Sequence, residues 1–196
     1  MVFSGIPFLY YFLPCVLLAY FVVPKSFKNF VLLIASLIFY AWGEPVYVFL
    51  MLFSILFGYL TGILLEKSME NDWRILTPGR ILAGSVFVFA GLFIYFKYTD
   101  FLISNINELV GSQIPLLKIA LPIGISFYTF QIISYLVDVY RKDVPAQKNF
   151  ISLAAYVSMF PQLIAGPIVR YQDVEKQLTV SFKTLHLQAV YVCFFI

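Results

Sequence analysis

Long uncharged apolar runs are the dominant pattern along the chain. About 20 consecutive apolar residues span the hydrocarbon core of a bilayer, and a charge at its centre is costly. These runs therefore predict helices that cross or enter a membrane. Six of them are complete and a seventh begins close to the last residue: Met1–Pro24, Asn29–Gly43, Pro45–Leu65, Ile81–Phe96, Ile119–Val137, Asn149–Val169 and Thr184–Ile196.

Residues Asp100–Ser112 follow a different periodicity. Apolar side chains recur at helical spacing along one face, and polar side chains occupy the opposite face: Leu102, Ile103, Ile106, Leu109 and Val110 against Ser104, Asn105, Asn107 and Glu108. This pattern is typical of an amphipathic helix that lies in the membrane interface.

The run Asn149–Val169 is interrupted by turn-forming residues. Pro161, Gly166 and Pro167 break the helical hydrogen-bond pattern within a few residues. Irregular backbone at membrane depth is tolerated only inside protein or beside water. We therefore favour a re-entrant segment, with a kinked span as the alternative. The expected fold is an all-α, polytopic transmembrane helical bundle of about five spans plus the re-entrant segment and the interfacial helix, with a truncated final span.

Basic residues predict the orientation, because cytoplasmic loops are enriched in Lys and Arg. With the N-terminus outside, the external loops hold only Lys97 and Lys118, and eight basic residues are cytoplasmic: Lys25, Lys28, Lys67, Arg74, Arg80, Arg141, Lys142 and Lys148. Three more, Arg170, Lys176 and Lys183, follow the interrupted run. They are cytoplasmic if that run turns back, and external if it crosses.

Composition supports a membrane protein. The 196 residues are 62% hydrophobic and only 12% charged, with a mean hydropathy of +0.91, whereas a soluble domain is about half apolar and a quarter charged. A net charge of +3, without a basic cluster, gives no reason to expect nucleic acid as a partner. Two cysteines inside apolar runs and a single histidine predict neither a disulfide framework nor a metal site.

Few residues suggest chemistry by themselves. Gly58 and Gly62 form a GxxxG pair, which favours close helix packing within the chain over a dimer face. Gln131, Ser134 and Asp138 share a helical face that predicts either interhelical hydrogen bonding or the polar wall of a cavity. His186 is interpreted as a packing or interfacial residue rather than a general base. No nucleotide-binding, nucleophile-elbow or zinc-protease motif is present in the sequence.

Two longer motifs carry a family resemblance. Residues Leu121–Arg141 read LPIGISFYTFQIISYLVDVYR, and Met159–Tyr171 read MFPQLIAGPIVRY. With these motifs the chain resembles the membrane-bound O-acyltransferase family, in the branch that acetylates bacterial exopolysaccharides such as alginate. The likeness runs through almost the whole chain. The resemblance implies a multi-pass protein of the bacterial cytoplasmic (inner) membrane.

The resemblance also implies a mechanism. A cytoplasmic thioester, acetyl-CoA or an acyl carrier, is the acyl donor and substrate, and no cofactor is bound. A membrane-buried histidine acts on the attacking hydroxyl, and exclusion of water protects the thioester from hydrolysis. Membrane lipid and extracytoplasmic acetyltransferase or polysaccharide-assembly proteins are the implied partners.

The family's histidine lies in tryptophan-rich motifs that this chain lacks. We therefore interpret residues 1–196 as a single membrane domain, the N-terminal part of a longer acyltransferase that is inactive alone, and assign no catalytic residue and no metal. The resemblance offers only five residues as substrate-binding or gate candidates: Pro161, Gln162, Gly166, Pro167 and Arg170.

Three other functions stay open. A teichoic-acid D-alanyl transfer component shares the architecture that the resemblance implies. A transporter also has broken helices at substrate sites, but transporters usually carry internal repeats, and the motif patterns occur once in this sequence. The third alternative is a non-catalytic membrane scaffold.

Overall fold

A computed structural model of the chain describes residues 5–24, 27–71, 76–111, 114–165 and 171–172. The predicted all-helical class is confirmed, because the described residues form helices and no strand. In chain order the elements are a π-helical turn η1 (Phe8–Phe12), α1 (Leu13–Val22), α2 (Lys28–Gly43), α3 (Tyr47–Glu70), α4 (Pro78–Val110), α5 (Ile125–Tyr140), α6 (Phe150–Ser158) and α7 (Phe160–Ala165).

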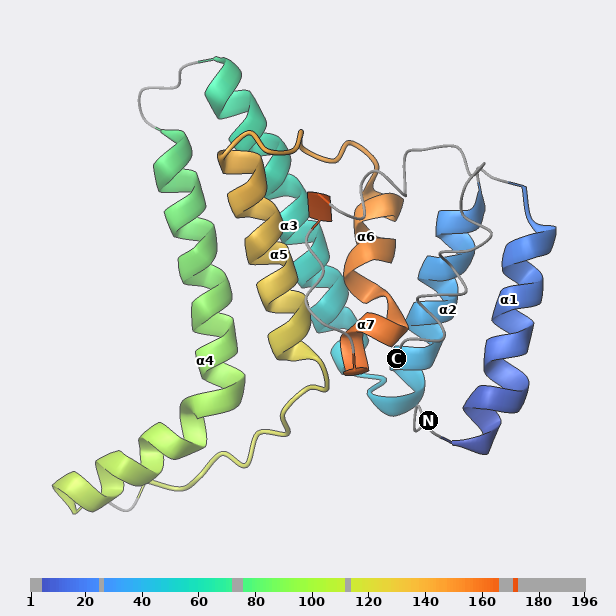
Figure 1. Ribbon diagram of the computed structural model, residues 1–196. Helices are drawn as coiled ribbons and strands as arrows, with labels where there is room; N and C mark the ends of the chain where they lie inside the picture. The colour runs from blue at the N-terminus through green and yellow to red at the C-terminus, as the bar shows by residue number, and fades with distance from the viewer. Residues whose placement is uncertain (1–4, 25–26, 72–75, 112–113, 166–170, 173–196) are drawn as a thin grey trace.

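Helices α3, α5 and α6 form the centre of the bundle. Helix α3 packs against α4, α5 and α6, and α2 packs against α1 and α6. Figure 1 shows α4 and α1 at opposite margins of this arrangement. The buried core includes Met51, Ile55 and Leu65 of α3 and Ile132 and Leu136 of α5.

The glycine pair of α3 packs within the chain, as the sequence predicts. A Cβ atom added at Gly58 would lie 2.5 Å from Cγ2 of Ile132, and one at Gly62 would lie 2.7 Å from the hydroxyl oxygen of Tyr135. Larger side chains at these two positions would push α5 away from α3. The absence of side chains therefore brings the two helix backbones together.

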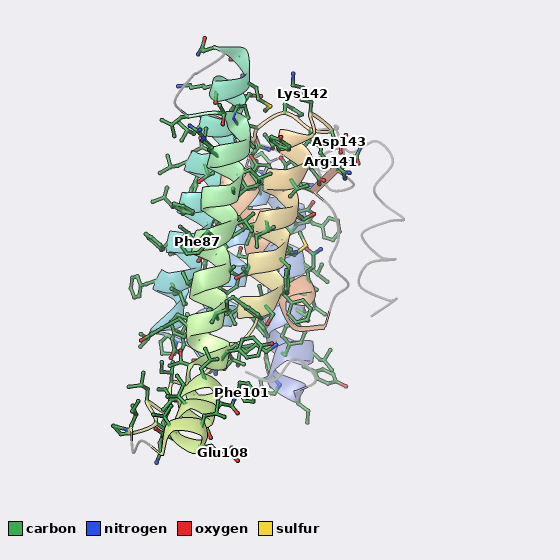
Figure 2. All side chains as sticks on the ribbon, turned by 90° about the vertical axis from the view of Figure 1, so that its left-hand side faces the viewer. Phe87, Phe101, Glu108, Arg141, Lys142 and Asp143 are labelled. Atoms are coloured by element: carbon green, nitrogen blue, oxygen red, sulfur yellow. The ribbon has the colours of Figure 1, made fainter. Side chains whose placement is uncertain are left out.

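Among the described residues, two helices, α3 and α4, are long and apolar enough to cross a membrane, and the N-terminal helices 8–22 and α2 are apolar but shorter. Large apolar side chains such as Leu18, Val22 and Phe87 are exposed on the marginal helices. Phe87 projects away from the bundle in Figure 2. A lipid environment accounts for this surface, since a soluble protein rarely exposes a large apolar patch.

Helix α4 combines two segments that the sequence predicts as separate elements. The run Ile81–Phe96 and most of the amphipathic segment Asp100–Ser112 form one helix of 33 residues, which ends where Gly111 adopts a positive φ of 68°. Such a helix is about 50 Å long, well beyond the roughly 30 Å hydrocarbon core. Figure 1 shows its C-terminal part bending away from the bundle. We call residues 97–110 the arm of α4.

Helix α5 begins later than its apolar run predicts. The run Ile119–Val137 opens with a non-helical segment, and the helix starts only at Ile125. Pro122 has no N–H group to donate, and Gly124 has a left-handed φ of 75°. The hydroxyl groups of Tyr40 and Tyr47 donate to the carbonyl oxygens of Ile123 and Ala120, each at 2.9 Å. These bonds fasten the segment to the last part of α2 and to the start of α3.

Basic side chains gather at one end of the bundle. Six of the eight Lys and Arg residues in the described ranges lie where α2, α4 and α6 begin and where α3 and α5 end: Lys28, Lys67, Arg80, Arg141, Lys142 and Lys148. Figure 2 places Arg141 and Lys142 at the end opposite to Phe101 and Glu108 of the arm. We call the first the basic end and the second the far end.

Candidate functional site

The interrupted segment folds as two short helices. Asn149 caps α6, its Oδ1 accepting from the backbone N–H of Ile151 at 2.9 Å. Helix α6 has only nine residues, and its side chains from Ser152 to Ser158 are buried. Nine residues span about 14 Å, which is less than half of a hydrocarbon core. The helix ends at Ser158, because the next residue, Met159, has a ψ of 113°, which is not helical.

Helix α7 is held against the start of α5. A Cβ atom added at Gly124 would lie 2.8 Å from Cγ of Leu163. Gly124 is therefore needed for its left-handed φ and for the close approach of α7. The sequence motif around Gly124 and the motif around Leu163 meet at this contact. The two segments that carry the family resemblance are thus neighbours in space.

Four phenylalanine rings enclose the junction between α6 and α7. The ring of Phe160 lies 5.7 Å from that of Phe8, 5.7 Å from that of Phe12 and 5.6 Å from that of Phe39, measured between centroids. Phe8 and Phe12 bound the π-helical turn η1, and Phe39 belongs to α2. Such aromatic contacts fix ring orientation in addition to burying apolar area. The start of the chain therefore helps to position the broken segment.

Three tyrosines meet on the other side of α6. The ring centroid of Tyr171 lies 4.9 Å from that of Tyr135 and 5.2 Å from that of Tyr156, and all three side chains are buried. Gln147 binds two members of this cluster. Its backbone N–H donates to the hydroxyl of Tyr135 at 2.9 Å, and its Nε2 donates to the hydroxyl of Tyr171 at 2.7 Å. Tyr171 therefore lies beside residues that precede α6.

The structure places only part of the predicted site. Pro161 is half-buried and Gln162 is buried, both in α7. Proline suits the first turn of a helix, where its missing N–H has no partner in any case. The other candidates, Gly166, Pro167 and Arg170, lie outside the described residues, and so do His186 and the run Thr184–Ile196.

The predicted polar face of α5 is turned inward. Gln131 and Asp138 are buried and Ser134 is half-buried. The Oε1 atom of Gln131 has no hydrogen-bond partner in the part of the chain that the structure describes. Interhelical hydrogen bonding therefore does not account for this oxygen.

A cleft at the basic end was not foreseen from the sequence. It has a volume of about 410 Å³ and is lined by residues from the end of α3 and from the end of α5 with its following loop: Glu66, Met69, Glu70, Val139, Lys142, Val144 and Pro145. The backbone N–H of Ala146 donates to Oε1 of Glu66 at 3.1 Å and ties the loop to α3. Residues about 80 positions apart form this cleft, and no local pattern predicts such a pairing. Within the described ranges, no three His, Cys, Asp or Glu side chains gather as a metal site.

Comparison with known proteins shows long similarities to O-acetylases. The chain is 41% identical to the probable alginate O-acetylase AlgI of Pseudomonas aeruginosa, over 90% of this chain and 34% of that protein. It is 39% identical to the protein of the same name from Azotobacter vinelandii, over 94% of this chain and 37% of the relative. It is 33% identical to a peptidoglycan O-acetyltransferase of Helicobacter pylori, over 87% and 37% of the two chains.

The similarity confirms the resemblance drawn from the two motifs. The chain spans about a third of the length of these curated relatives. No family model matches the sequence, and no solved structure matches the fold.

Proposed function

We propose that this chain, a homologue of the bacterial alginate O-acetylases, is part of a membrane-bound O-acyltransferase that transfers an acetyl group across the membrane to hydroxyls of an extracellular polysaccharide. The observation that carries this proposal is the identity of about 40% to alginate O-acetylases over nine tenths of the chain. The peptidoglycan O-acetyltransferase among the relatives supports a glycan hydroxyl as the acceptor. A thioester, acetyl-CoA or an acyl carrier, is the donor in this proposal.

The proposed topology has several spans in the bacterial cytoplasmic membrane, with the basic end inside. Six of the described Lys and Arg residues lie at that end, and cytoplasmic loops carry the excess of these residues. A cytoplasmic thioester then meets the protein at the end that holds the cleft beside Glu66 and Lys142. Polysaccharide-assembly proteins and an extracytoplasmic acetyltransferase are the proposed partners at the far end, and lipid surrounds the bundle.

Contacts of Tyr171 support a re-entrant segment. Helix α6 is too short to cross, and α7 follows a break in the backbone. The hydroxyl of Tyr171 accepts from Gln147, which precedes α6 near the basic end. A chain that crossed the membrane between these two residues would place them on opposite sides. Their contact therefore favours a segment that enters from the basic end and returns to it.

The arm of α4 supports an interfacial helix at the far end. Leu109 is 85% exposed and Val110 is 75% exposed, and no described segment covers them. Another side of the arm is bonded to the segment that follows it in the chain. Oδ1 of Asn107 accepts from the N–H of Ile114 at 3.0 Å, and Oδ1 of Asp100 accepts from the N–H of Leu117 at 2.9 Å. An apolar side open to its surroundings suits a helix lying at the headgroup boundary.

Loss of acetyl groups from the extracellular polymer tests the function. In a strain lacking the gene, we expect O-acetyl content to fall and to return when the full-length gene is restored. Unchanged acetylation with loss of ester-linked alanine from a wall polymer would instead indicate D-alanyl transfer. If neither modification changes while export of a solute does, the protein is a transporter.

Arg170 provides a test of the proposed site residues. Together with Pro161, Gln162, Gly166 and Pro167, we propose that it lines the path between donor and acceptor. Arg170→Ala in the full-length protein should impair polymer acetylation while membrane abundance is unchanged. Arg170→Lys should recover only part of it, because a point charge cannot replace a planar fork of donors. Normal acetylation in both variants would make Arg170 a headgroup anchor only.

A further inference from the structure

Five uncharged polar side chains inside the bundle have an oxygen atom without a hydrogen-bond partner in the described ranges: Thr129 of α5, with 2% of its surface exposed, and four that are buried still more completely. Ser36 belongs to α2, Tyr128 and Gln131 to α5, and Ser158 to α6. Each of these four side chains is buried, with at most 1% of its surface exposed. No hydrogen bond within the described ranges reaches the hydroxyl oxygens of Ser36, Tyr128 and Ser158 or Oε1 of Gln131. We call these four residues the polar layer.

A hydrogen bond between α2 and α6 places their two members at one depth. Nδ2 of Asn29 donates to the hydroxyl of Ser152 at 3.2 Å, near the starts of the two helices. Both helices then run from the basic end toward the far end. Ser36 follows Asn29 by seven residues and Ser158 follows Ser152 by six. At a rise of 1.5 Å per residue, they lie about 10 Å and about 9 Å further along.

The members of α5 fall in the same part of the bundle. The hydroxyl of Tyr135 accepts from the N–H of Gln147, which precedes α6. Helix α5 runs in the opposite direction, so residues before Tyr135 lie deeper from the basic end. Gln131 is about 6 Å and Tyr128 about 10 Å deeper along the axis. The layer is therefore well inside the bundle.

Three other buried helical hydroxyls in the described ranges are satisfied locally. Ser54, Thr61 and Ser85 donate to carbonyl oxygens of the preceding turn, at 2.9, 2.7 and 2.7 Å. The phenol of Tyr40 donates to the carbonyl oxygen of Ile123. The oxygens of the polar layer have no such hydrogen bond to a carbonyl group, although a buried polar group without a partner costs free energy. Its members therefore point to a ligand.

We propose that the polar layer binds internal water molecules at membrane depth. Hydroxyl groups can donate to and accept from water, and an amide oxygen can accept from it. None of the four groups is charged, so the layer offers no counter-ion to a charged ligand. All four side chains are enclosed, which excludes a sugar or a protein segment as the ligand. Buried waters typically bridge such otherwise unsatisfied groups.

Radiolytic hydroxyl-radical labelling of the full-length protein in ¹⁸O-water tests this proposal. Radicals form from bound water, so Tyr128 should be oxidised although it is fully buried. Phe89 of α4, with 1% of its surface exposed and packed against Phe57, is the matched control. We expect labelling of Tyr128 to be several-fold faster than that of Phe89. Equal, background-level rates for the two rings would overturn the proposal.

The sign of a stability change gives a second, independent test. Tyr128→Phe and Ser158→Ala each remove one hydroxyl with little change in shape. If water bridges these groups, each variant lowers the Tm of the full-length protein. If the groups have no ligand, removal of an unpaired hydroxyl leaves Tm unchanged or raises it, which contradicts bound water. Ser54→Ala removes a hydroxyl that is hydrogen-bonded to its own helix. The Tm change of this control variant measures what the loss of a satisfied hydroxyl costs. The labelling result does not depend on how the variants fold.

Discussion

Single residues determine how closely the two resemblance motifs approach each other. Gly124 and Gly111 both have a left-handed backbone, with φ of 75° and 68°. Of the two, only Gly124 is crowded, since a Cβ atom added there would press on Leu163, whereas nothing lies within 4 Å of a Cβ at Gly111. Substituting alanine at Gly111 therefore tests backbone strain alone, whereas the same substitution at Gly124 adds a steric clash.

We expect Gly124→Ala to lower Tm more than Gly111→Ala does. Both changes incur about 1–2 kcal/mol for a left-handed backbone, and overpacking against Leu163 adds about 1–3 kcal/mol at Gly124 alone. Thermal melting of the purified protein in detergent measures the difference. Equal losses of Tm would show that α7 moves aside without cost.

At the scale of elements, two segments bend away from a simple up-and-down arrangement. The break at Met159 separates α6 from α7, and the bend in α4 carries the arm away from the bundle. Hydrophobic runs alone do not decide whether either segment crosses the membrane. Accessibility measurements on single engineered cysteines, in a background without Cys15 and Cys193, can test both.

A cysteine at Gln172 should react only with reagent applied from the cytoplasm. Gln172 is exposed, whereas its neighbour Tyr171 is buried, so Gln172 reports the side without disturbing the tyrosine cluster. An impermeant thiol reagent on intact cells and on inverted vesicles distinguishes the two sides. Labelling of Gln172→Cys on intact cells would mean that the segment crosses the membrane.

A fluorophore on the apolar side of the arm should be quenched by brominated lipid. Leu109 is the most exposed large apolar residue of the arm, and Ser104 lies nearly opposite to it on the helix. We expect strong quenching for a label at Leu109→Cys and weak quenching at Ser104→Cys. The same quenching at both positions would place the arm either in water or fully inside the hydrocarbon.

At the scale of the whole molecule, charge and apolar surface define an axis. Basic residues lie at one end, the arm lies at the other, and exposed apolar side chains cover the marginal helices between them. An orientation with the basic end inside satisfies the positive-inside tendency.

Cysteines at Asn71 and Gly111 should label from opposite sides. Asn71 directly follows α3 at the basic end, and Gly111 directly follows α4 at the far end; both are exposed. On intact cells we expect Gly111→Cys to react with an impermeant reagent and Asn71→Cys to be protected until the membrane is opened. The reverse pattern would invert the proposed orientation, and every assignment of sides with it.

The sequence by itself determined the class of the protein. Uncharged runs, sparse charges and proline breaks predict a helical membrane protein with an interrupted segment, because transfer of charge into hydrocarbon is costly wherever it occurs in the fold. The GxxxG pair predicted a close helix contact, since small residues permit one in any arrangement. The two long motifs predicted the relatives, and these predictions needed no knowledge of which helices are neighbours.

Only the tertiary structure decided where the pieces meet. The start of α5 depends on Tyr40 and Tyr47 holding a distant loop. The place of Tyr171, beside residues that precede α6, depends on Gln147 donating to its hydroxyl. Ser36, Tyr128 and Ser158 are ordinary residues in the sequence, and their shared depth follows from the register of three helices. Such pairings are set by packing between residues far apart in the chain, and local periodicity carries no information about them.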